Sequence, residues 1–294
     1  MSSTATEKIR FPSIEESPWD TEIVPPRITT ALNLPELLRY RHLIAMFVRR
    51  DFVVYYRQTV LGPLWWLLQP LITCGVFVIV FGVFLRIYTD GIPRPLFYLS
   101  GLTLWAYFAG SFTHISSLFS SQGGLFGKIY FPRLAVPVAQ LLSNLMKFGL
   151  QTSFMTALYL IYVLNGLEIR PSWTLVFAPL LILYLAVLAL GFGLLFNSLA
   201  YKYRDMSLTT PFIIQMWMFL SFIIYPMSAV PEKYHWFLCF NPVIPAVETF
   251  RYMLFGTGTV PPWYWGISLL TTVIVLALGL TSFAYTSQRF IDTV

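Results

Sequence analysis

Six long apolar stretches, almost free of charged side chains, constrain this chain more than any other feature of its sequence. A helix needs about 20 apolar residues to cross the roughly 30 Å of hydrocarbon in a bilayer, and each stretch is long enough. Among Asp, Glu, Lys and Arg, only Lys147 lies inside any of them. Their approximate bounds are Leu61–Leu85, Leu96–Leu118, Leu134–Val163, Trp173–Ala200, Leu208–Ala229 and Gly266–Thr286. The sequence therefore predicts an all-α polytopic membrane protein with six transmembrane helices.

The low charge of the whole chain supports the membrane class. Charged residues make up 11% of the 294 residues, whereas soluble domains carry about 25%. The net charge of +6 would suggest nucleic acid in a soluble protein. Here many basic residues flank apolar stretches, as expected at an anionic lipid surface, so we expect membrane lipids as partners and no nucleic acid. Cys74 and Cys239 show no disulfide or metal-ligand spacing, so no metal site is predicted.

The distribution of basic residues predicts the orientation of the chain. If both termini are cytosolic, the inner segments carry most of the 19 lysines and arginines, in agreement with the positive-inside rule. Residues 1–26 are polar and lack the apolar core of a signal peptide, so the first span is expected to direct its own insertion. The predicted organisation is a cytosolic N-terminus with an interface helix over residues 1–60, followed by a six-span transmembrane domain over residues 61–294.

Residues 34–57, just before the first span, are predicted to form an amphipathic helix. At 100° per residue, apolar and aromatic side chains gather on one face and basic ones on the other, although Arg41 and Asp51 fall on the apolar side. This pattern is typical of a helix lying in the membrane interface; the alternative is a cytosolic helix packed against another part of the protein. In the interfacial position, the basic side chains would meet an anionic lipid headgroup. They are Arg39, Arg49, Arg50 and Arg57.

The segment "RRDFVVYYRQTVLGPLWWLLQPL", Arg49–Leu71, resembles the entry segment of type-2 ABC exporter permeases that move bacterial polysaccharides. The shared features are, in order, Arg-Asp, aromatic-Arg, Leu-Gly-Pro-x-Trp and Gln-Pro. "FPRLAVP" (Phe131–Pro137) and "NPVIPAVETFRYMLFG" (Asn241–Gly256) also resemble family elements. The resemblance covers nearly the whole chain. It implies six spans with re-entrant outer helices before the last one, a homodimer, two copies of a cytosolic ABC ATPase subunit, and a lipid-linked polysaccharide as substrate at the bacterial inner membrane.

The energy for such transport has to come from another chain. A phosphate-binding loop of the G-x-x-x-x-G-K-[ST] type is absent from the sequence. The nearest match, Gly123–Lys128, has glutamine at the first glycine position and isoleucine at the Ser/Thr position. We therefore expect no cofactor and no enzymatic activity in this chain, with ATP and Mg on the partner ATPase.

Two inner loops, Ser121–Arg133 and Tyr201–Met206, are candidates for ATPase docking or simply for anchoring at the membrane. The first is longer than an anchor requires. In the family this loop forms a coupling helix, a role that the resemblance places on Leu125–Phe131. The residues expected at the ATPase contact are Leu125, Phe126, Lys128, Tyr130, Phe131 and Arg204.

The third span carries polar side chains spaced 4, 3 and 4 residues apart, so that they share one helical face. They are Gln140, Asn144, Lys147 and Gln151. A charge near the middle of a membrane costs at least about 2.5 kcal/mol, so Lys147 should face a partner or water. The stripe predicts either the polar wall of a conduit or hydrogen bonds between helices of the bundle.

Aromatic side chains repeat on one face at the end of the first span and on one face of the second. Aromatic rings bind the apolar faces of sugars, but they also pack against lipids and other helices. Together with the amide-rich stripe they favour a glycan conduit over an ion channel, which would show rings of charge or a filter motif. The aromatic residues assigned to the conduit are Phe77, Phe81, Phe84, Tyr88, Trp105, Phe108 and Phe112.

The last outer loop, residues 231–265, is too long for a simple turn. Its second half is a short helix candidate that ends at Gly256, in which Glu248 and Arg251 are spaced to offset each other's charge. Such a helix suits a re-entrant element that lines a cavity, or alternatively an outer helix lying on the surface. The family uses this region for gate helices at the outer mouth. The residues assigned to this outer gate are Asn241, Pro242, Glu248 and Arg251.

The predicted function is that of a permease subunit in an ATP-driven exporter of lipid-linked polysaccharide. The alternatives are an exporter of drugs or lipids with the same architecture, a passive channel, and a membrane-embedded glycosyl- or acyltransferase. The transferase has little support, because His42, His114 and His235 are dispersed and no acid lies near His114 in the sequence.

Overall fold

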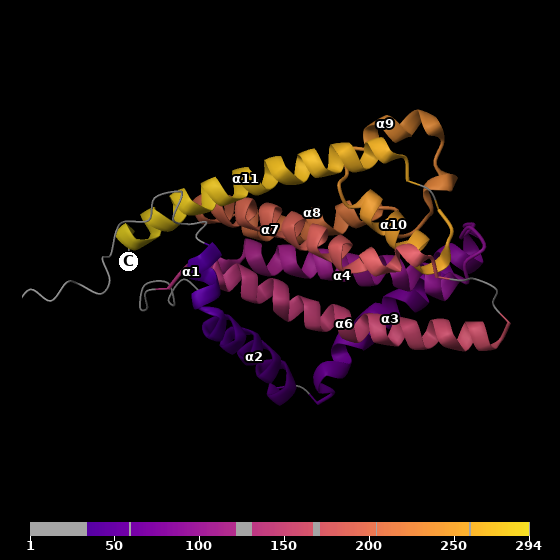
Figure 1. Ribbon diagram of the computed structural model, residues 1–294, viewed down its shortest axis with the longest axis horizontal. Helices are drawn as coiled ribbons and strands as arrows, with labels where there is room; N and C mark the ends of the chain where they lie inside the picture. The colour runs from indigo at the N-terminus through magenta and orange to yellow at the C-terminus, as the bar shows by residue number, and fades with distance from the viewer. Residues whose placement is uncertain are drawn as a thin grey trace, which may run out of the picture.

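The computed structural model describes residues 34–58, 60–121, 131–166, 171–203, 205–258 and 260–293. Over these ranges every regular element is a helix (Figure 1), which confirms the all-α class for the described part of the chain. The helices are α1 (Leu34–Arg39), α2 (Arg41–Gln58), η1 (Gly62–Leu64), α3 (Trp65–Phe77), η2 (Val78–Phe84), α4 (Arg94–Ser116), α6 (Ala135–Leu164), η3 (Trp173–Phe177), α7 (Ala178–Lys202), α8 (Asp205–Phe219), η4 (Met227–Ala229), η5 (Glu232–Tyr234), α9 (His235–Leu238), α10 (Ile244–Phe255) and α11 (Pro262–Thr293).

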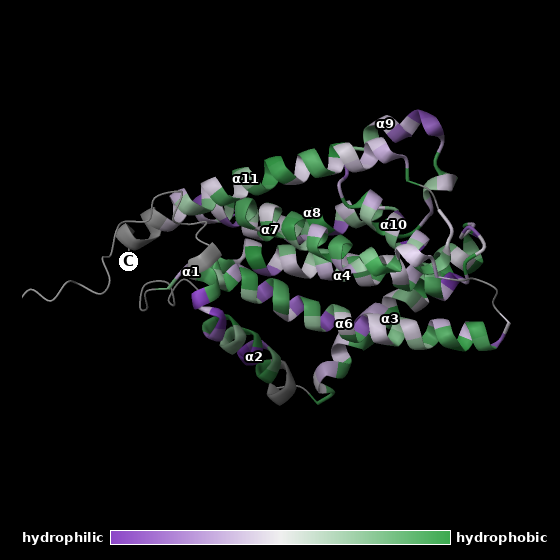
Figure 2. Cartoon of the chain, in the orientation of Figure 1, coloured by the Kyte–Doolittle hydropathy of each residue, from purple (hydrophilic) through white to green (hydrophobic). Residues whose placement is uncertain are grey.

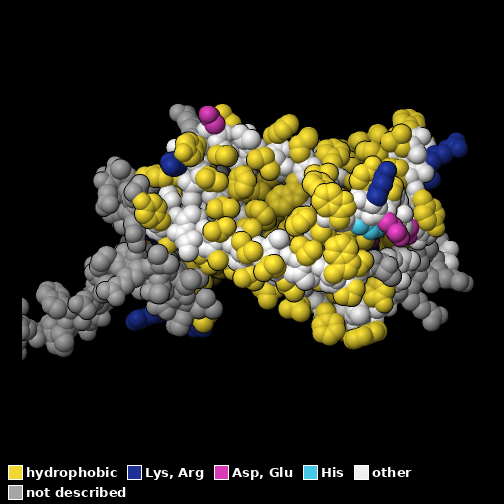
Figure 3. Space-filling model, turned by 90° about the horizontal axis from the view of Figure 1, so that it is seen from above, with side chains coloured by type: hydrophobic (Ala, Val, Ile, Leu, Met, Phe, Trp, Pro, Cys, Tyr) yellow, Lys and Arg dark blue, Asp and Glu magenta, His cyan; other side chains and the backbone are white. Residues whose placement is uncertain are grey.

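Three helical stretches of the described chain are long and apolar enough to cross a membrane. They are Gly62–Phe84, Trp173–Lys202 and Pro262–Ser287. Figure 2 shows apolar residues running along these helices, and Figure 3 shows a broad apolar surface whose charged side chains lie toward its two ends. The other three predicted stretches coincide largely with α4, α6 and α8. The structure therefore supports a membrane protein with several crossings, and the number six stays a prediction.

Helix α4 lies at the centre of the bundle. It packs against α3, α6, α7, α8 and α10, and every residue from Leu96 to Trp105 is buried, which covers all sides of the helix. A helix that is apolar all round is expected to be buried on all sides. This central position makes α4 the element against which both candidate sites described below are built.

Two glycines allow α7 and α11 to pack closely along each other. A Cβ at Gly191 would lie 2.9 Å from the backbone nitrogen of Leu276 on α11, and a Cβ at Gly279 would meet the carbonyl oxygen of Gly191. Small residues at such contacts let membrane helices approach until their backbones touch. The close contact between α7 and α11 therefore requires glycine, which has no side chain, at both positions.

Replacing Gly279 with alanine is expected to lower the free energy of unfolding by about 1–3 kcal/mol, because the added methyl group meets backbone that cannot move aside. Gly266 on the same helix is the matched control, since a Cβ there meets no atom within 4 Å. Thermal unfolding in detergent should show a lower midpoint for Gly279→Ala and an unchanged or higher midpoint for Gly266→Ala. Equal midpoints for the two variants would contradict the close approach.

The helix predicted over residues 34–57 is present as two helices, α1 and α2, which are separated by a turn at Tyr40. On α2, the apolar side chains of Ile44 and Phe47 are buried against Ile115 of α4 and Ala135 of α6. The apolar face of α2 therefore packs on the bundle, as the alternative interpretation expects. The position of α2 in a membrane interface stays a prediction.

The helix predicted over residues 208–229 is too long, because α8 ends at Phe219. Phe222 lies in a turn with φ of +55°, which is rare for a bulky residue. The carbonyl oxygens of Phe222 and Ile223 accept hydrogen bonds from the Arg251 guanidinium at 2.7 and 3.0 Å. These carbonyls are satisfied by a side chain from α10, so the backbone can leave the helix without burying unpaired acceptors.

Helix α1 and the C-terminal end of α11 lie at the same end of the bundle, and α9 and α10 lie toward the opposite end (Figure 1). Both ends of the described chain are thus on one side of the bundle. This arrangement fits an even number of crossings.

Candidate functional site

A cavity of about 380 Å³ lies between α2, α3, α4 and α6. In a chain with few charged residues, its lining is unusually rich in charged and polar side chains. They are Arg50, Asp51, His114, Ser117, Ser121, Gln140, Ser143 and Lys147. The cavity therefore joins the helix before the first span to the polar stripe of the third, which are far apart in the sequence.

Asp51 holds α2 to α6. One carboxylate oxygen accepts a hydrogen bond from Gln140 Nε2 at 2.9 Å and another from Ser143 Oγ at 3.3 Å. The other oxygen forms an ion pair with Arg50 at 2.9 Å. From the sequence, Asp51 was noted as a break in the apolar face of its helix and as part of the Arg-Asp feature of the family, and no contact with the third span was predicted for it. An acidic residue on the apolar face of a helix indicates a polar contact with the bundle, because a charge that turns toward the bundle needs polar partners there.

The predicted stripe on α6 does share one face, and that face meets α2 and the start of α3. Lys147 Nζ donates to Asn144 Oδ1 at 3.0 Å and lies 5.6 Å from the centre of the Trp66 ring. Gln151 Nε2 donates to the backbone carbonyl of Trp66 at 2.9 Å. Asp51 and Lys147 are far apart in the sequence, but their side chains line the same cavity. Within one protomer the stripe makes contacts between helices; its role in a conduit stays a prediction.

The aromatic residues assigned to the conduit fall into two groups. Trp105, Phe108 and Phe112 of α4 are buried. Phe108 packs against Trp217 of α8 and Phe112 against Phe196 of α7, whereas the Trp105 ring packs against Phe108. On the first span, Phe77 is buried and Phe81 is partly buried, with their ring centroids 5.3 Å apart. Phe84 and Tyr88 are 74% and 70% exposed. Of the seven assigned aromatic residues, this last pair presents the most exposed rings.

The basic residues assigned to a lipid headgroup differ in their surroundings. Arg39 and Arg49 are exposed, and Arg50 lines the cavity beside Asp51. The side chain of Arg57 lies outside the described residues. Of the three members whose side chains are described, only Arg50 lines the cavity.

Most of the predicted ATPase contact lies outside the described residues, namely Leu125, Phe126, Lys128, Tyr130 and Arg204. Phe131 is described. It is buried, and its ring centroid lies 6.1 Å from that of Phe47 on α2. The end of the predicted coupling loop therefore contacts the same helix that Asp51 holds to α6.

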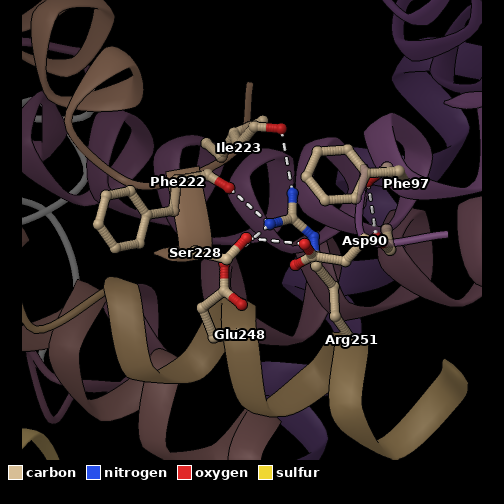
Figure 4. Close-up of polar contacts among 8 residues, drawn as sticks. Asp90, Phe97, Phe222, Ile223, Ser228, Glu248 and Arg251 are labelled. Carbon is tan, nitrogen blue, oxygen red and sulfur yellow. Dashed lines mark hydrogen bonds and ion pairs between the residues drawn. The ribbon is translucent and has the colours of Figure 1, made fainter. Parts of the chain in front are cut away.

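A buried ion pair forms a second polar site near the opposite end of the bundle (Figure 4). Arg251 Nη1 lies 3.0 Å from Glu248 Oε1, and each of these side chains is 2% exposed. The Arg251 guanidinium also lies 3.7 Å from the centre of the Phe97 ring on α4. The ion pair expected from the i, i+3 spacing is thus present, and Arg251 in addition holds the turn after α8.

Three further hydrogen bonds hold the segments around α10 to the rest of the bundle. Ser228 Oγ donates to Asp90 Oδ1 at 2.7 Å, which connects η4 to the loop after the first span. This link was missed from the sequence, because 138 positions separate the two residues. Asn241 accepts a hydrogen bond from Trp217 Nε1 at 3.0 Å, and the carbonyl of Pro242 accepts one from the Tyr184 hydroxyl at 2.7 Å. Asn241 and Pro242 therefore fasten the outer segment to α8 and α7.

The fold and these sites define a helical membrane protein whose buried charges join helices to one another. Comparison with known proteins gives the family. Residues 42–255 match the model of the ABC-2 type transporter, and the chain belongs to that family. The resemblance to type-2 ABC exporter permeases is thereby confirmed.

Individual relatives are similar over most of their length. The O-antigen export system permease protein of Klebsiella pneumoniae is 28% identical over 253 residues, which cover 85% of this chain and 94% of that protein. The polysialic acid transport protein of Escherichia coli is 25% identical over 238 residues, or 75% and 84% of the two chains. The capsule polysaccharide export inner-membrane protein of Neisseria meningitidis is 22% identical over 266 residues, or 87% and 95%. These names refer to different polysaccharides, so the similarity points to no single glycan.

Proposed function

We propose that this chain is the permease subunit of an ATP-driven exporter that moves a lipid-linked polysaccharide across the bacterial inner membrane. The observation that carries the proposal is the family match from α2 through α10, together with relatives named for polysaccharide export over most of the chain. The chain contributes the passage through the membrane. ATP and Mg belong to two copies of a separate cytosolic ATPase subunit.

The proposed topology has six crossings with both termini in the cytosol. It is supported by the common position of α1 and the end of α11 at one end of the bundle (Figure 1). The chain acts as a homodimer, with the conduit between the two copies. Ile72, Val76 and Ile79 of the first span are exposed apolar side chains, which face either lipid or the second copy.

In the proposed mechanism, ATP hydrolysis reaches the membrane through the loop that ends at Phe131. The Phe131 ring packs against Phe47 of α2, and Asp51 of α2 is bonded to Gln140 on α6. Movement of the loop would therefore be passed to α2 and then to the third span. Within the conduit, Phe84 and Tyr88 are the best candidates for sugar stacking, since their rings are exposed. The Glu248–Arg251 pair forms part of an outer gate.

Deletion of the gene in the host bacterium tests the function. We expect the lipid-linked polysaccharide to accumulate inside the cell and to disappear from the surface, and the intact gene to restore export. Immunoblotting of separated membranes with an antibody to the surface glycan measures both pools. A normal surface glycan combined with altered drug resistance or lipid composition would favour the alternative exporter. Transfer or hydrolysis of the glycan by the purified chain alone would favour the transferase.

A further inference from the structure

The cavity between α2, α3, α4 and α6 has a net positive lining. Arg50 and Lys147 contribute two positive charges, and Asp51 contributes one negative charge. A volume of about 380 Å³ lies within the range of pockets that hold small ligands, roughly 300–1,000 Å³. Because charges inside a membrane protein usually mark a functional site, the cavity is a candidate for binding an anionic group.

The charge of Asp51, the acid of the lining, is paired with Arg50, so the lining keeps one net positive charge. Asp51 Oδ1 accepts from Arg50, and Oδ2 accepts from Gln140 and Ser143. These bonds hold the three donor side chains in place around the cavity. Asp51 therefore acts as an internal counter-ion that keeps the polar wall in one arrangement.

The rim of the cavity is apolar and open. Val54 of α2 and Met146 of α6 line it and are 44% and 46% exposed. Trp66 also lines it, with its ring 5.6 Å from that of Phe52. A ligand with an anionic head and an apolar tail matches this combination, whereas a free phosphate ion gains nothing from the apolar rim.

We propose that this cavity binds the phosphate of an anionic lipid headgroup between Arg50 and Lys147, with the lipid tail leaving past Val54 and Met146. Two lipids carry this chemistry: a bulk anionic phospholipid and the diphosphate-bearing carrier of a glycan. Binding of the glycan carrier rests on the proposed function, whereas binding of a bulk phospholipid does not. Arg50 lines the cavity, whereas Arg41 on the same helix is exposed and does not line it.

The test is native mass spectrometry of the purified full-length chain after incubation with defined lipids. The probes are phosphatidylglycerol, a polyprenyl diphosphate, and diacylglycerol as a lipid without phosphate. The variants are Lys147→Met, Lys147→Arg and Arg50→Gln, with Arg41→Gln as the matched control on the same helix. Because Arg50 is at the exposed side of the cavity, Arg50→Gln tests the site even if Lys147→Met does not fold.

The wild-type chain is expected to retain the phosphate-bearing lipids and not diacylglycerol. Lys147→Met and Arg50→Gln should each lower retention about tenfold or more, the effect of losing a charged hydrogen bond. Lys147→Arg and Arg41→Gln should retain lipid as the wild type does. Equal retention by all variants, or an equal loss in Arg41→Gln and Arg50→Gln, would overturn the proposal.

Competition between the two probes distinguishes the sources. Displacement of phosphatidylglycerol by the polyprenyl diphosphate would assign the site to the carrier lipid, and retention of phosphatidylglycerol would assign it to bulk phospholipid. Either result supports a phosphate site. If the chain retains lipid normally but exports no glycan, the result contradicts the proposed function and leaves the lipid site supported.

Discussion

Replacing Arg251 with methionine is expected to lower the free energy of unfolding by about 3–5 kcal/mol, because it leaves the Glu248 carboxylate buried without its counter-charge. Both side chains are 2% exposed, so water cannot substitute for the lost partner. The substitution also removes the donors to the carbonyls of Phe222 and Ile223, which hold the turn after α8. Thermal unfolding in detergent, followed by size-exclusion chromatography, measures the loss.

A double-mutant cycle separates the ion pair from these other contacts. Glu248→Gln combined with Arg251→Met should cost less than the sum of the two single changes, because neither partner then leaves a bare charge. Additive losses would remove the claim that the two residues are coupled. Lys233→Met is the control for loss of a positive charge near the same end, since Lys233 is exposed and lies over the Tyr234 ring at 4.8 Å. Its expected cost is below about 1 kcal/mol.

Replacing Asp51 with alanine is expected to lower the free energy of unfolding by about 2–4 kcal/mol. It removes the acceptor of Gln140 and Ser143, and a buried donor left without a partner costs about 1–3 kcal/mol. If α2 passes movement to the third span, export should fall further than ATP hydrolysis does in the assembled transporter. Denaturation in detergent measures the first effect, and the ratio of exported glycan to released phosphate measures the second.

Asp51→Asn and Arg49→Ala are the matched variants for this prediction. Asparagine keeps one acceptor oxygen for α6 and loses the charge that pairs with Arg50, so its effect should be intermediate. Arg49 is exposed on the same helix, and its replacement should change stability by less than about 0.5 kcal/mol. A loss in Arg49→Ala as large as in Asp51→Ala would show that the link through Asp51 is not what holds α2.

Features that depend on local spacing could be predicted from the sequence. The common face of Gln140, Lys147 and Gln151 follows from helical geometry. The Glu248–Arg251 pair follows from spacing within one helix turn. In both cases the residues lie on one helix, so no knowledge of its neighbours was needed.

Features that depend on which helices meet could not be predicted in this way. Asp51 and Gln140 are 89 positions apart, so a single sequence offers no reason to join them. The aromatic face of α4 is present, but only the packing of α7 and α8 shows that Phe108 and Phe112 are buried in the protomer. The end of α8 at Phe219 could not be predicted for the same reason, because the turn that follows it is held by the Arg251 guanidinium from α10.

Transport by the purified components tests the proposed function most directly. The chain and its ATPase partner would be placed in vesicles that carry the host's lipid-linked polysaccharide on the ATPase side. A glycan-specific antibody would then measure the polysaccharide that reaches the opposite face. We predict that the glycan crosses only when both subunits and hydrolysable ATP are present. Crossing with this chain alone and without ATP, or ATP-dependent movement of the lipid only when it bears no glycan, would contradict the function proposed for this permease.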